Sequence, residues 1–373
     1  MSILETEALS TIDEVLEDVK RGRMIVLVDA EDRENEGDLV IPAEMANSEV
    51  INFMAKHGRG LICLALTAQR VEELGLPLMP RENLSRHQTA FTVSIEAREG
   101  VSTGISAGDR ALTIAVATDP TKGRADISTP GHVFPLVARD GGVLVRAGHT
   151  EAAVDLARLA GFNAAGVICE IMNDDGSMAR MPDLIKFAQL HGIKVATISD
   201  LIAHRMRYDT IVERVGEKDL DSLFGGTFRM MVYRTTVEAG EHVALIKGDI
   251  TTDEPVLVRV HVFDVLGDVL GAKASRGGVM QNAMRLISEA DRGVVVLIRK
   301  TSIQSLSDHI RGGGSGESPS QIDKWREVGI GSQILRDLGV RDMILLSNSQ
   351  RALVGIEGYG LRVVERRTVP VEN

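Results

Sequence analysis

The stretch MIVLVDAEDRENEGD, residues 24–38, joins a short apolar segment to the most acidic run of the chain. Residues 24–28 predict a buried strand, and six carboxylates follow within ten residues, with Arg33 as the one cation among them. Like charges at this spacing repel one another. A hard divalent cation and a hydroxyl-rich ligand would compensate them, and strand ends are common places for such chemistry. A solvated acidic loop is the alternative that composition leaves open.

The composition of the whole chain limits the classes of function. With 373 residues the chain is long enough for two domains, and its 44% hydrophobic and 25% charged content is ordinary for a globular protein. A net charge of -11 argues against nucleic acid as a partner, because its phosphates would be repelled. No apolar run approaches ~18 residues, so we expect no membrane span. The acidic N-terminus and the two cysteines, Cys63 and Cys169, do not suggest export, so we expect a cytoplasmic protein.

Helical and strand patterns alternate along the first half of the chain. Thr11 and Glu14 fit a capping box, and the apolar positions that follow have the spacing of a helix. This alternation predicts an α+β domain with a mixed sheet and covering helices. The expected strands lie at 61–66, 91–96, 143–145, 166–170 and 194–198, the expected helices at 48–56 and 151–160 (the latter amphipathic), and a long mobile loop at 77–90.

A charge-dense stretch, RMRYDTIVERVGEKDLDS at residues 205–222, is typical of a linker between two cores. We therefore expect a first domain over residues 1–206 and a second, of the α/β class, over residues 207–373. In the second, strands are expected at 228–233, 242–247, 256–263 and 343–347, a helix at 331–339, and a glycine- and serine-rich loop at 312–320.

A second constellation, RAGHTE at residues 146–151, follows one expected strand and opens the expected helix. Thr150 suits the N-cap position, and Gly148 lets the backbone approach a ligand. The free N–H groups of a helix N-terminus, with Arg146 beside them, are a natural phosphate site. His149 can hold a metal through a ring nitrogen. A capped helix with an exposed histidine is the alternative.

Further polar residues fall in expected turns and at strand ends. His132 lies between Pro130 and Pro135 in an expected extended turn. Glu170 ends an apolar strand, where a carboxylate can serve as an acid or a base. The stretch GVSTGISAG, residues 100–108, is a candidate contact for phosphate or hydroxyl groups. Each of these features alone is also compatible with a purely structural role.

The chain resembles 3,4-dihydroxy-2-butanone-4-phosphate synthase of riboflavin biosynthesis in four sequence motifs, which occur in this order: DAEDRENEGDL (29–39), GHVFPL (131–136), RAGHTEAAVDLARLAG (146–161) and CEIMNDDGSMAR (169–180). The resemblance covers the first half of the chain almost continuously. It implies a lyase that converts D-ribulose 5-phosphate to 3,4-dihydroxy-2-butanone 4-phosphate and formate with Mg²⁺. It also implies a homodimer with each active site at the subunit interface.

The same resemblance assigns roles to residues of this chain. The implied metal ligands are Glu34 and His149, and the histidine would also suit Mn²⁺ as a substitute for Mg²⁺. The implied catalytic residues are His132 and Glu170. The implied contacts with the sugar phosphate are Arg33, Glu34, Asp38, Arg146, Ala147, Gly148, His149, Thr150 and Glu170.

The second half of the chain resembles GTP cyclohydrolase II through EHVALIKGDI (241–250) and GSQILRDLGV (331–340). That family holds a zinc ion with three cysteines, whereas both cysteines of this chain lie in the first half. In place of that family's zinc-binding motifs, this chain has HVFD at 261–264 and SRG at 275–277. In place of its arginine-rich catalytic motif, the chain has RKTS at 299–302. We therefore expect a second domain without zinc or catalysis. A bifunctional enzyme that also opens GTP, and a non-catalytic scaffold, are the alternatives.

Overall fold

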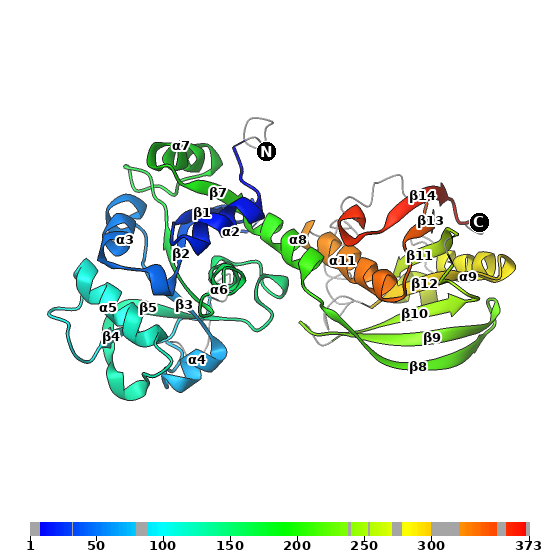
Figure 1. The fold of residues 1–373 in the computed structure, drawn as a ribbon, viewed down its shortest axis with the longest axis horizontal. Coiled ribbons are helices and arrows are strands. Elements are labelled where there is room, and N and C mark those ends of the chain that lie inside the picture. The colour runs from blue at the N-terminus through cyan, green and yellow to red at the C-terminus, as the bar shows by residue number, and fades with distance from the viewer. Residues whose placement is uncertain are drawn as a thin grey trace. The chain divides into compact units, whose positions relative to one another are not determined.

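Two sheets, one in each half of the chain, organise the protein (Figure 1). The computed structural model describes residues 8–31, 33–79, 89–237, 240–252, 254–270, 278–299, 321–348 and 356–370. The chain divides into Met1–His204, called unit 1, and Arg205–Asn373, called unit 2. Most of the loop predicted at 77–90, and the loop predicted at 312–320, lie outside the described residues.

The sheet of unit 1 is mixed, as the sequence predicts. Strand β1 pairs in parallel with β7 on one side and antiparallel with β2 on the other. The order across the described sheet is β4-β5-β3-β6-β2-β1-β7. The strands are β1 (Ile25–Val28), β2 (Gly37–Pro42), β3 (Cys63–Thr67), β4 (Ile95–Ala97), β5 (Ile127–Ala138), β6 (Ala165–Glu170) and β7 (Lys194–Thr197).

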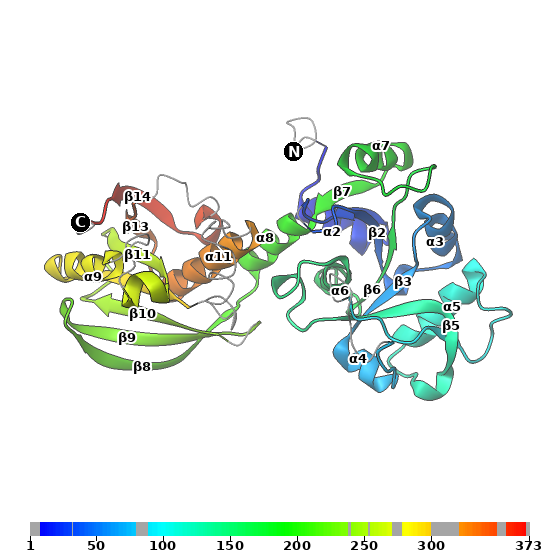
Figure 2. The ribbon, with the colours of Figure 1, turned by 180° about the vertical axis from the view of Figure 1, so that it is seen from behind.

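Helices pack around this sheet, and Figure 2 shows the same elements from behind. The predicted capping box at Thr11 and Glu14 is present and begins α2. A π-helical turn, Met54–Gly58, continues α3 through the predicted helix at 48–56. Cys63 and Cys169 are free and buried. The helices are α2 (Ile12–Lys20), α3 (Ser48–Phe53), α4 (Ala68–Glu73), α5 (Ala107–Thr118), α6 (His149–Leu159), α7 (Met181–His191) and α8 (Ile198–Tyr208).

Helix α6 differs from its prediction. It packs against β2, β3 and β6, and all its residues from 149 to 157 are buried, so its polar side chains do not face solvent as those of a surface helix would. Its buried acids are satisfied by backbone: Glu151 accepts the N–H of Arg139 (3.0 Å) and Asp155 that of Val143 (2.8 Å). The latter bond folds the segment predicted as a strand at 143–145 into the 3-10 helix Gly142–Leu144. The helix begins at His149 with Gly148 as N-cap, so the prediction of Thr150 as N-cap is wrong.

Unit 2 has an α/β half and an antiparallel half in one sheet, ordered β14-β13-β11-β12-β10-β9-β8 among the described strands. Strands β11 to β14 run parallel to their partners within this group, and β8 to β10 pair antiparallel. The elements are β8 (Val212–Ser222), β9 (Gly226–Thr235), β10 (Glu241–Lys247), β11 (Val256–Val262), α9 (Val279–Glu289), β12 (Gly293–Ile298), α11 (Gln321–Asp337), β13 (Asp342–Leu346) and β14 (Arg362–Arg367).

The charge-dense stretch at 205–222 is not a linker. It forms the end of α8 and the whole of β8, an edge strand whose residues are largely exposed. An edge strand tolerates charges on both faces, and they protect it from pairing with other chains. Gln333 on α11 stabilises the connection between α8 and β8. Its side chain accepts the N–H of Ile211 (2.9 Å) and donates to the carbonyls of Met206 (2.7 Å) and Asp209 (2.8 Å).

Two further elements differ from their predictions. Helix α11 begins at Gln321, ten residues before the predicted start, and β4 occupies only the end of the predicted strand at 91–96. None of the helices in the described part of the chain is long and apolar enough to cross a membrane.

Candidate active site

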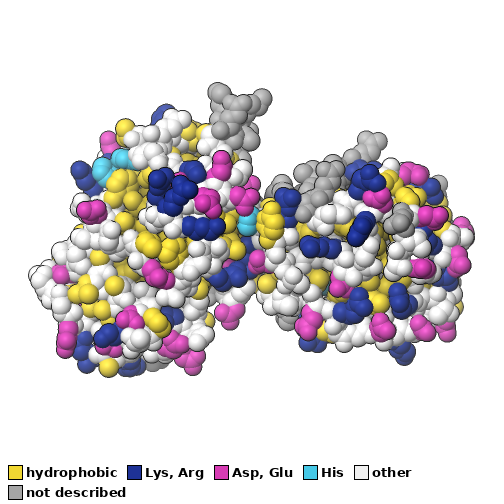
Figure 3. Space-filling view, viewed as in Figure 1, with side chains coloured by type: hydrophobic (Ala, Val, Ile, Leu, Met, Phe, Trp, Pro, Cys, Tyr) yellow, Lys and Arg dark blue, Asp and Glu magenta, His cyan; other side chains and the backbone are white. Residues whose placement is uncertain are grey.

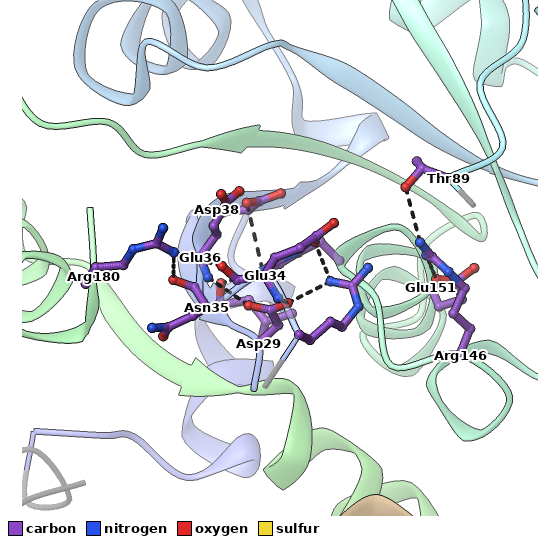
Figure 4. Close-up of polar contacts among 12 residues, drawn as sticks. Asp29, Glu34, Asn35, Glu36, Asp38, Thr89, Arg146, Glu151 and Arg180 are labelled. Atoms are coloured by element: carbon purple, nitrogen blue, oxygen red, sulfur yellow. Dashed lines mark hydrogen bonds and ion pairs between the residues drawn. The ribbon is translucent and has the colours of Figure 1, made fainter. Parts of the chain in front are cut away.

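The acidic loop between β1 and β2 is organised by Asp29, whose side chain is completely buried. Its Oδ1 accepts the N–H of Glu36 (2.8 Å), and its Oδ2 accepts the N–H of Glu34 (3.1 Å). Arg33 donates Nη1 to Asp29 (2.7 Å) and to Glu34 (2.5 Å). The loop therefore turns back on one carboxylate, as Figure 4 shows.

Arg180 ties the same loop to the start of α7. Its Nη1 donates to the carbonyl of Glu34 (2.8 Å) and to that of Asn35. Asn35 has a left-handed backbone, with φ of 56°, a conformation that asparagine tolerates better than most residues. Two cationic side chains thus hold the loop. Arg33 does so from within it, and Arg180 does so from the end of the motif CEIMNDDGSMAR (Figure 4).

Three residues of this region form a group that can hold a metal ion. Ligand atoms of Asp29, Glu34 and His149 lie within 4.8 Å of one another. His149 is the first residue of α6 and is buried, with Nε2 donating to the carbonyl of Leu27 (3.1 Å). Burial lowers the pKa of His149 and so favours the neutral ring, the form that coordinates a cation. The predicted exposed histidine is therefore the wrong alternative.

Asp38 and Glu170 lie opposite each other on β2 and β6. Burial and the charge of Glu170 raise the pKa of Asp38 well above its usual range. Asp38 Oδ1 is buried and has no hydrogen-bond partner among the described residues; His149 Nε2 is 3.8 Å away. A buried carboxylate without compensation is costly. Nearby positive charge would relieve that cost, so this set of oxygen and nitrogen donors fits a divalent cation.

His132 lies on β5 and Glu170 on β6, with β3 between these two strands. Cys63 on β3 pairs with Phe134 on one side and with Ile168 on the other, and the N–H of Leu61 donates to Glu170 Oε2 (2.8 Å). Among the described residues, His132 makes no hydrogen bond with the acidic loop. Instead, its Nδ1 is hydrogen-bonded to Glu96.

The RAGHTE segment forms the N-terminus of α6. Arg146 donates to Glu151 (2.7 Å) and to Thr89 (3.2 Å), and Figure 4 shows this group on the α6 side of the acidic loop. A Cβ added to Gly148 would lie 2.3 Å from Arg146 Nη1, so only glycine allows the guanidinium to fold over the helix start. Ala147 and Thr150 flank this turn. The structure thus assembles the predicted phosphate-binding segment beside His149.

Four residues of the site had no predicted role. Asp29 and Glu151 belong to the sequence motifs described above. The position of Asp29 at the end of a strand, and that of Glu151 in the first turn of a helix, could have indicated a role. Arg180 is the last residue of the motif CEIMNDDGSMAR, but its spacing in the sequence did not indicate that it would contact the acidic loop. Glu96 had no signal, because its partner is on the neighbouring strand.

Comparisons with known proteins agree with this geometry. Residues 13–204 match the family model 3,4-dihydroxy-2-butanone 4-phosphate synthase, and residues 213–368 match GTP cyclohydrolase II. The chain is 52% identical over 361 residues to the 3,4-dihydroxy-2-butanone 4-phosphate synthase of Pseudomonas aeruginosa, covering 96% of this chain and 98% of that protein. The chain belongs to the 3,4-dihydroxy-2-butanone 4-phosphate synthase family.

Members of the synthase family include fused proteins of similar length. The chain is 47% identical to the riboflavin biosynthesis protein RibBA of Aquifex aeolicus, over 100% of this chain and 95% of that protein. The crystal structure of RibBX, a two-domain synthase from A. baumannii, superposes with a TM-score of 0.81 at 40% identity, over 97% of this chain and 100% of that one. The predicted family and the predicted two-part fold are therefore confirmed.

A solved synthase also informs the metal site. A crystal structure of 3,4-dihydroxy-2-butanone 4-phosphate synthase in complex with two magnesium ions has a TM-score of 0.52 and 42% identity, covering 54% of this chain and 99% of that chain. The coverage corresponds to about half of the present chain. Magnesium is thus a known ligand within the synthase family.

Proposed function

We propose that unit 1 converts D-ribulose 5-phosphate to 3,4-dihydroxy-2-butanone 4-phosphate and formate, as a lyase of riboflavin biosynthesis. The observation that carries the proposal is the pairing of the buried Asp38 with Glu170 beside the group of Asp29, Glu34 and His149. The two products together account for every atom of the substrate. The site therefore needs acids, bases and charge compensation, but no oxidant, reductant or second substrate.

Glu34 and His149 are the proposed ligands of Mg²⁺, with Mn²⁺ as a substitute. Both oxygens of Asp29 already accept hydrogen bonds from the loop, so we assign Asp29 to shaping the loop instead. When bound, the ion supplies positive charge beside the carbonyl and hydroxyl oxygens of the substrate, which makes a neighbouring C–H more acidic. The magnesium-bound relative and the partnerless oxygen of Asp38 support this assignment.

The remaining residues bind the sugar phosphate and move protons. The α6 N-terminus from Arg146 to Thr150 offers N–H groups and a guanidinium to the phosphate. We assign Arg33 and Asp38 to contacts with the sugar hydroxyls, because Arg33 donates to Glu34 and Asp38 lies 3.8 Å from His149, the two proposed metal ligands. Glu170 uses Oε2 for the N–H of Leu61, which leaves Oε1 for proton transfer. His132 is the second proposed acid–base group.

The proposal extends to a homodimer with the active site at the subunit interface. The side chain of His132 is 44% exposed. Two apolar residues are also exposed, Leu61 by 40% and Ile105 by 52%. Figure 3 shows hydrophobic side chains gathered on the face of unit 1 drawn toward the viewer. An apolar surface around a site supports a partner that covers it. Sedimentation analysis should give twice the chain mass, and a monomer with full activity would contradict this extension.

The decisive test is the reaction itself. Purified full-length protein with D-ribulose 5-phosphate and Mg²⁺ should release formate and the four-carbon phosphate in equal amounts, as measured by proton NMR. A chelator should stop the release, and added Mg²⁺ should restore it. A folded protein that binds the substrate without forming either product would instead support the scaffold alternative.

For unit 2 we propose a fold without GTP cyclohydrolase activity. The chain has no cysteine beyond Cys169, and His261, at the position of the zinc word, is already engaged through both ring nitrogens. Its Nε2 donates to Asp268 (2.8 Å), and its Nδ1 accepts from Arg259 (3.3 Å). Full-length protein supplied with zinc and GTP should release no formate. Stoichiometric zinc together with formate from GTP would favour the bifunctional alternative.

A further inference from the structure

We propose that His57 and His191 form a second metal site in unit 1, which takes a divalent transition metal such as Zn²⁺ rather than Mg²⁺. The pair shares no residue with the group of Asp29, Glu34 and His149, and the inference does not depend on the proposed reaction. It is carried by the geometry of the two rings, by the partners of their nitrogens, by their charge, and by the packing around them.

The first feature is the geometry of the two imidazole rings. His57 lies in the π-helical turn Met54–Gly58, and His191 is the last residue of α7. Their ring centroids are 4.8 Å apart and the ring planes are inclined by 58°, so the rings do not stack face to face. Two imidazoles that bind one Zn²⁺ at Zn–N distances of ~2.1 Å and a tetrahedral angle have centroids ~5 Å apart. The observed separation therefore matches that of two rings sharing an ion.

The second feature is the state of the ring nitrogens. Within the described part of the chain, neither His57 nor His191 makes a hydrogen bond or an ion pair, whereas the five other described histidines all hydrogen-bond through a ring nitrogen. Both residues are partly exposed, and Figure 3 shows histidine side chains on the surface of unit 1 between α3 and α7. The last torsion of histidine is broad, so each ring can turn a nitrogen toward a shared ion.

The third feature is the charge around the pair. Burial, followed by the nearby His191, Lys56 and Arg59, lowers the pKa of His57 and favours the neutral ring, the form that binds metals. The charge of Arg59 is compensated by Asp174 (2.5 Å). Imidazole nitrogens suit Zn²⁺, Ni²⁺ and Cu²⁺, whereas Mg²⁺ prefers oxygen ligands. Two imidazoles therefore select a transition metal, with water at its remaining positions.

The fourth feature is the packing that holds the two rings. Phe53 on α3 contacts both of them, with centroid distances of 4.7 Å to His57 and 5.0 Å to His191. Phe187, one turn earlier on α7, contacts His191 at 4.6 Å. Ligands that are held by packing lose less freedom when a metal binds, so the cluster favours binding by both rings.

The test is a zinc titration of the full-length protein labelled with ¹⁵N-histidine. His57→Phe and His191→Phe each keep a ring in the aromatic cluster but remove its nitrogens, and each variant identifies one ring signal. We expect the signals of the two histidines to shift together at the same zinc concentration. Either substitution removes one of two linked ligands, so the remaining ring should bind zinc about 10²-fold more weakly.

Two controls locate the effect. His149 belongs to the other metal site, so its signal should respond to zinc equally in the wild type and in both variants, which also establishes that the variants are folded. Lys56→Gln changes an exposed residue of the same turn without removing an imidazole, and it should bind zinc at least as tightly as the wild type.

Two results would overturn the inference. Zinc that shifts the signal of His149 but not those of His57 and His191 would show that the pair binds no metal. Signals of His57 and His191 that shift at different zinc concentrations, with either ring unaffected by loss of the other, would show that they do not share an ion. Neither result bears on formate release, so the proposed function is tested separately.

Discussion

At Glu34, one carboxylate serves both the acidic loop and the proposed metal site. Glu34→Gln removes a negative ligand but keeps the backbone contacts with Asp29 and Arg180. We expect affinity for Mn²⁺, measured by electron paramagnetic resonance, to fall at least 10-fold, since outer-shell changes alone cost that much. Glu31→Gln, an exposed carboxylate of the same run, is the control. Equal Mn²⁺ affinity in the two variants would contradict the ligand assignment.

The paired ligand needs a different substitution. His149 is buried and donates to Leu27, so His149→Ala would lose packing as well as a ligand. Its removal should therefore lower stability as well as metal affinity. His149→Asn retains a donor for that carbonyl and is the better variant for separating metal binding from stability.

His132 and Glu170 act on protons in the proposed reaction. His132→Asn and Glu170→Gln remove the titrating group while retaining similar size, and each should lower kcat about 10²- to 10⁴-fold with little change in KM. Steady-state assays of formate release measure the effect. Weak substrate binding with full turnover at saturation would reassign either residue to substrate binding.

At the scale of the element, α6 depends on its buried acids. Asp155→Ala leaves the buried N–H of Val143 without its acceptor, which should cost about 1–3 kcal/mol of unfolding free energy. Urea unfolding of the variant measures the loss. Asp140→Ala, an exposed aspartate in the same region, should unfold like the wild type. A loss of the same size in both variants would show that the hydrogen bond between Asp155 and Val143 is not its cause.

The elements also show what the sequence could predict. Local signals sufficed for α2, β1 and the acidic loop, because a capping box, an apolar run and clustered charges act over a few residues. The burial of α6 could not be predicted, because its acids bond to N–H groups at Arg139 and Val143, which only the fold brings near. The contacts from Glu96 to His132 and from Arg180 to the loop are tertiary in the same way.

At the scale of the whole molecule, acid should destabilise unit 2 through His242. His242 on β10 is buried, and burial together with Arg299 lowers its pKa to about 4. The unfolded chain takes up this proton near pH ~6.5. The contribution of the neutral His242 ring to the free energy of unfolding is therefore fully present above pH ~6.5. It is lost as the pH falls from ~6.5 to about 4.

Tryptophan fluorescence can follow this loss, because the single tryptophan, Trp325, lies on α11 of unit 2. The urea midpoint of the wild type should fall between pH 7 and pH 4.5. The His242→Gln variant lacks the titrating ring, so its midpoint should depend less on pH. The same pH slope in wild type and variant would remove His242 as the cause.

Because α8 runs through the boundary at His204, the gene cannot be cut there without cutting a helix. A protein that stops at residue 206 would lose the last two residues of α8 and the side chain of Gln333 that donates to the carbonyl of Met206. Proteases favour exposed loop tips, so limited proteolysis should not cleave the connection between α8 and β8. Removal of unit 2 should therefore also disturb the end of α8, a helix that begins in unit 1.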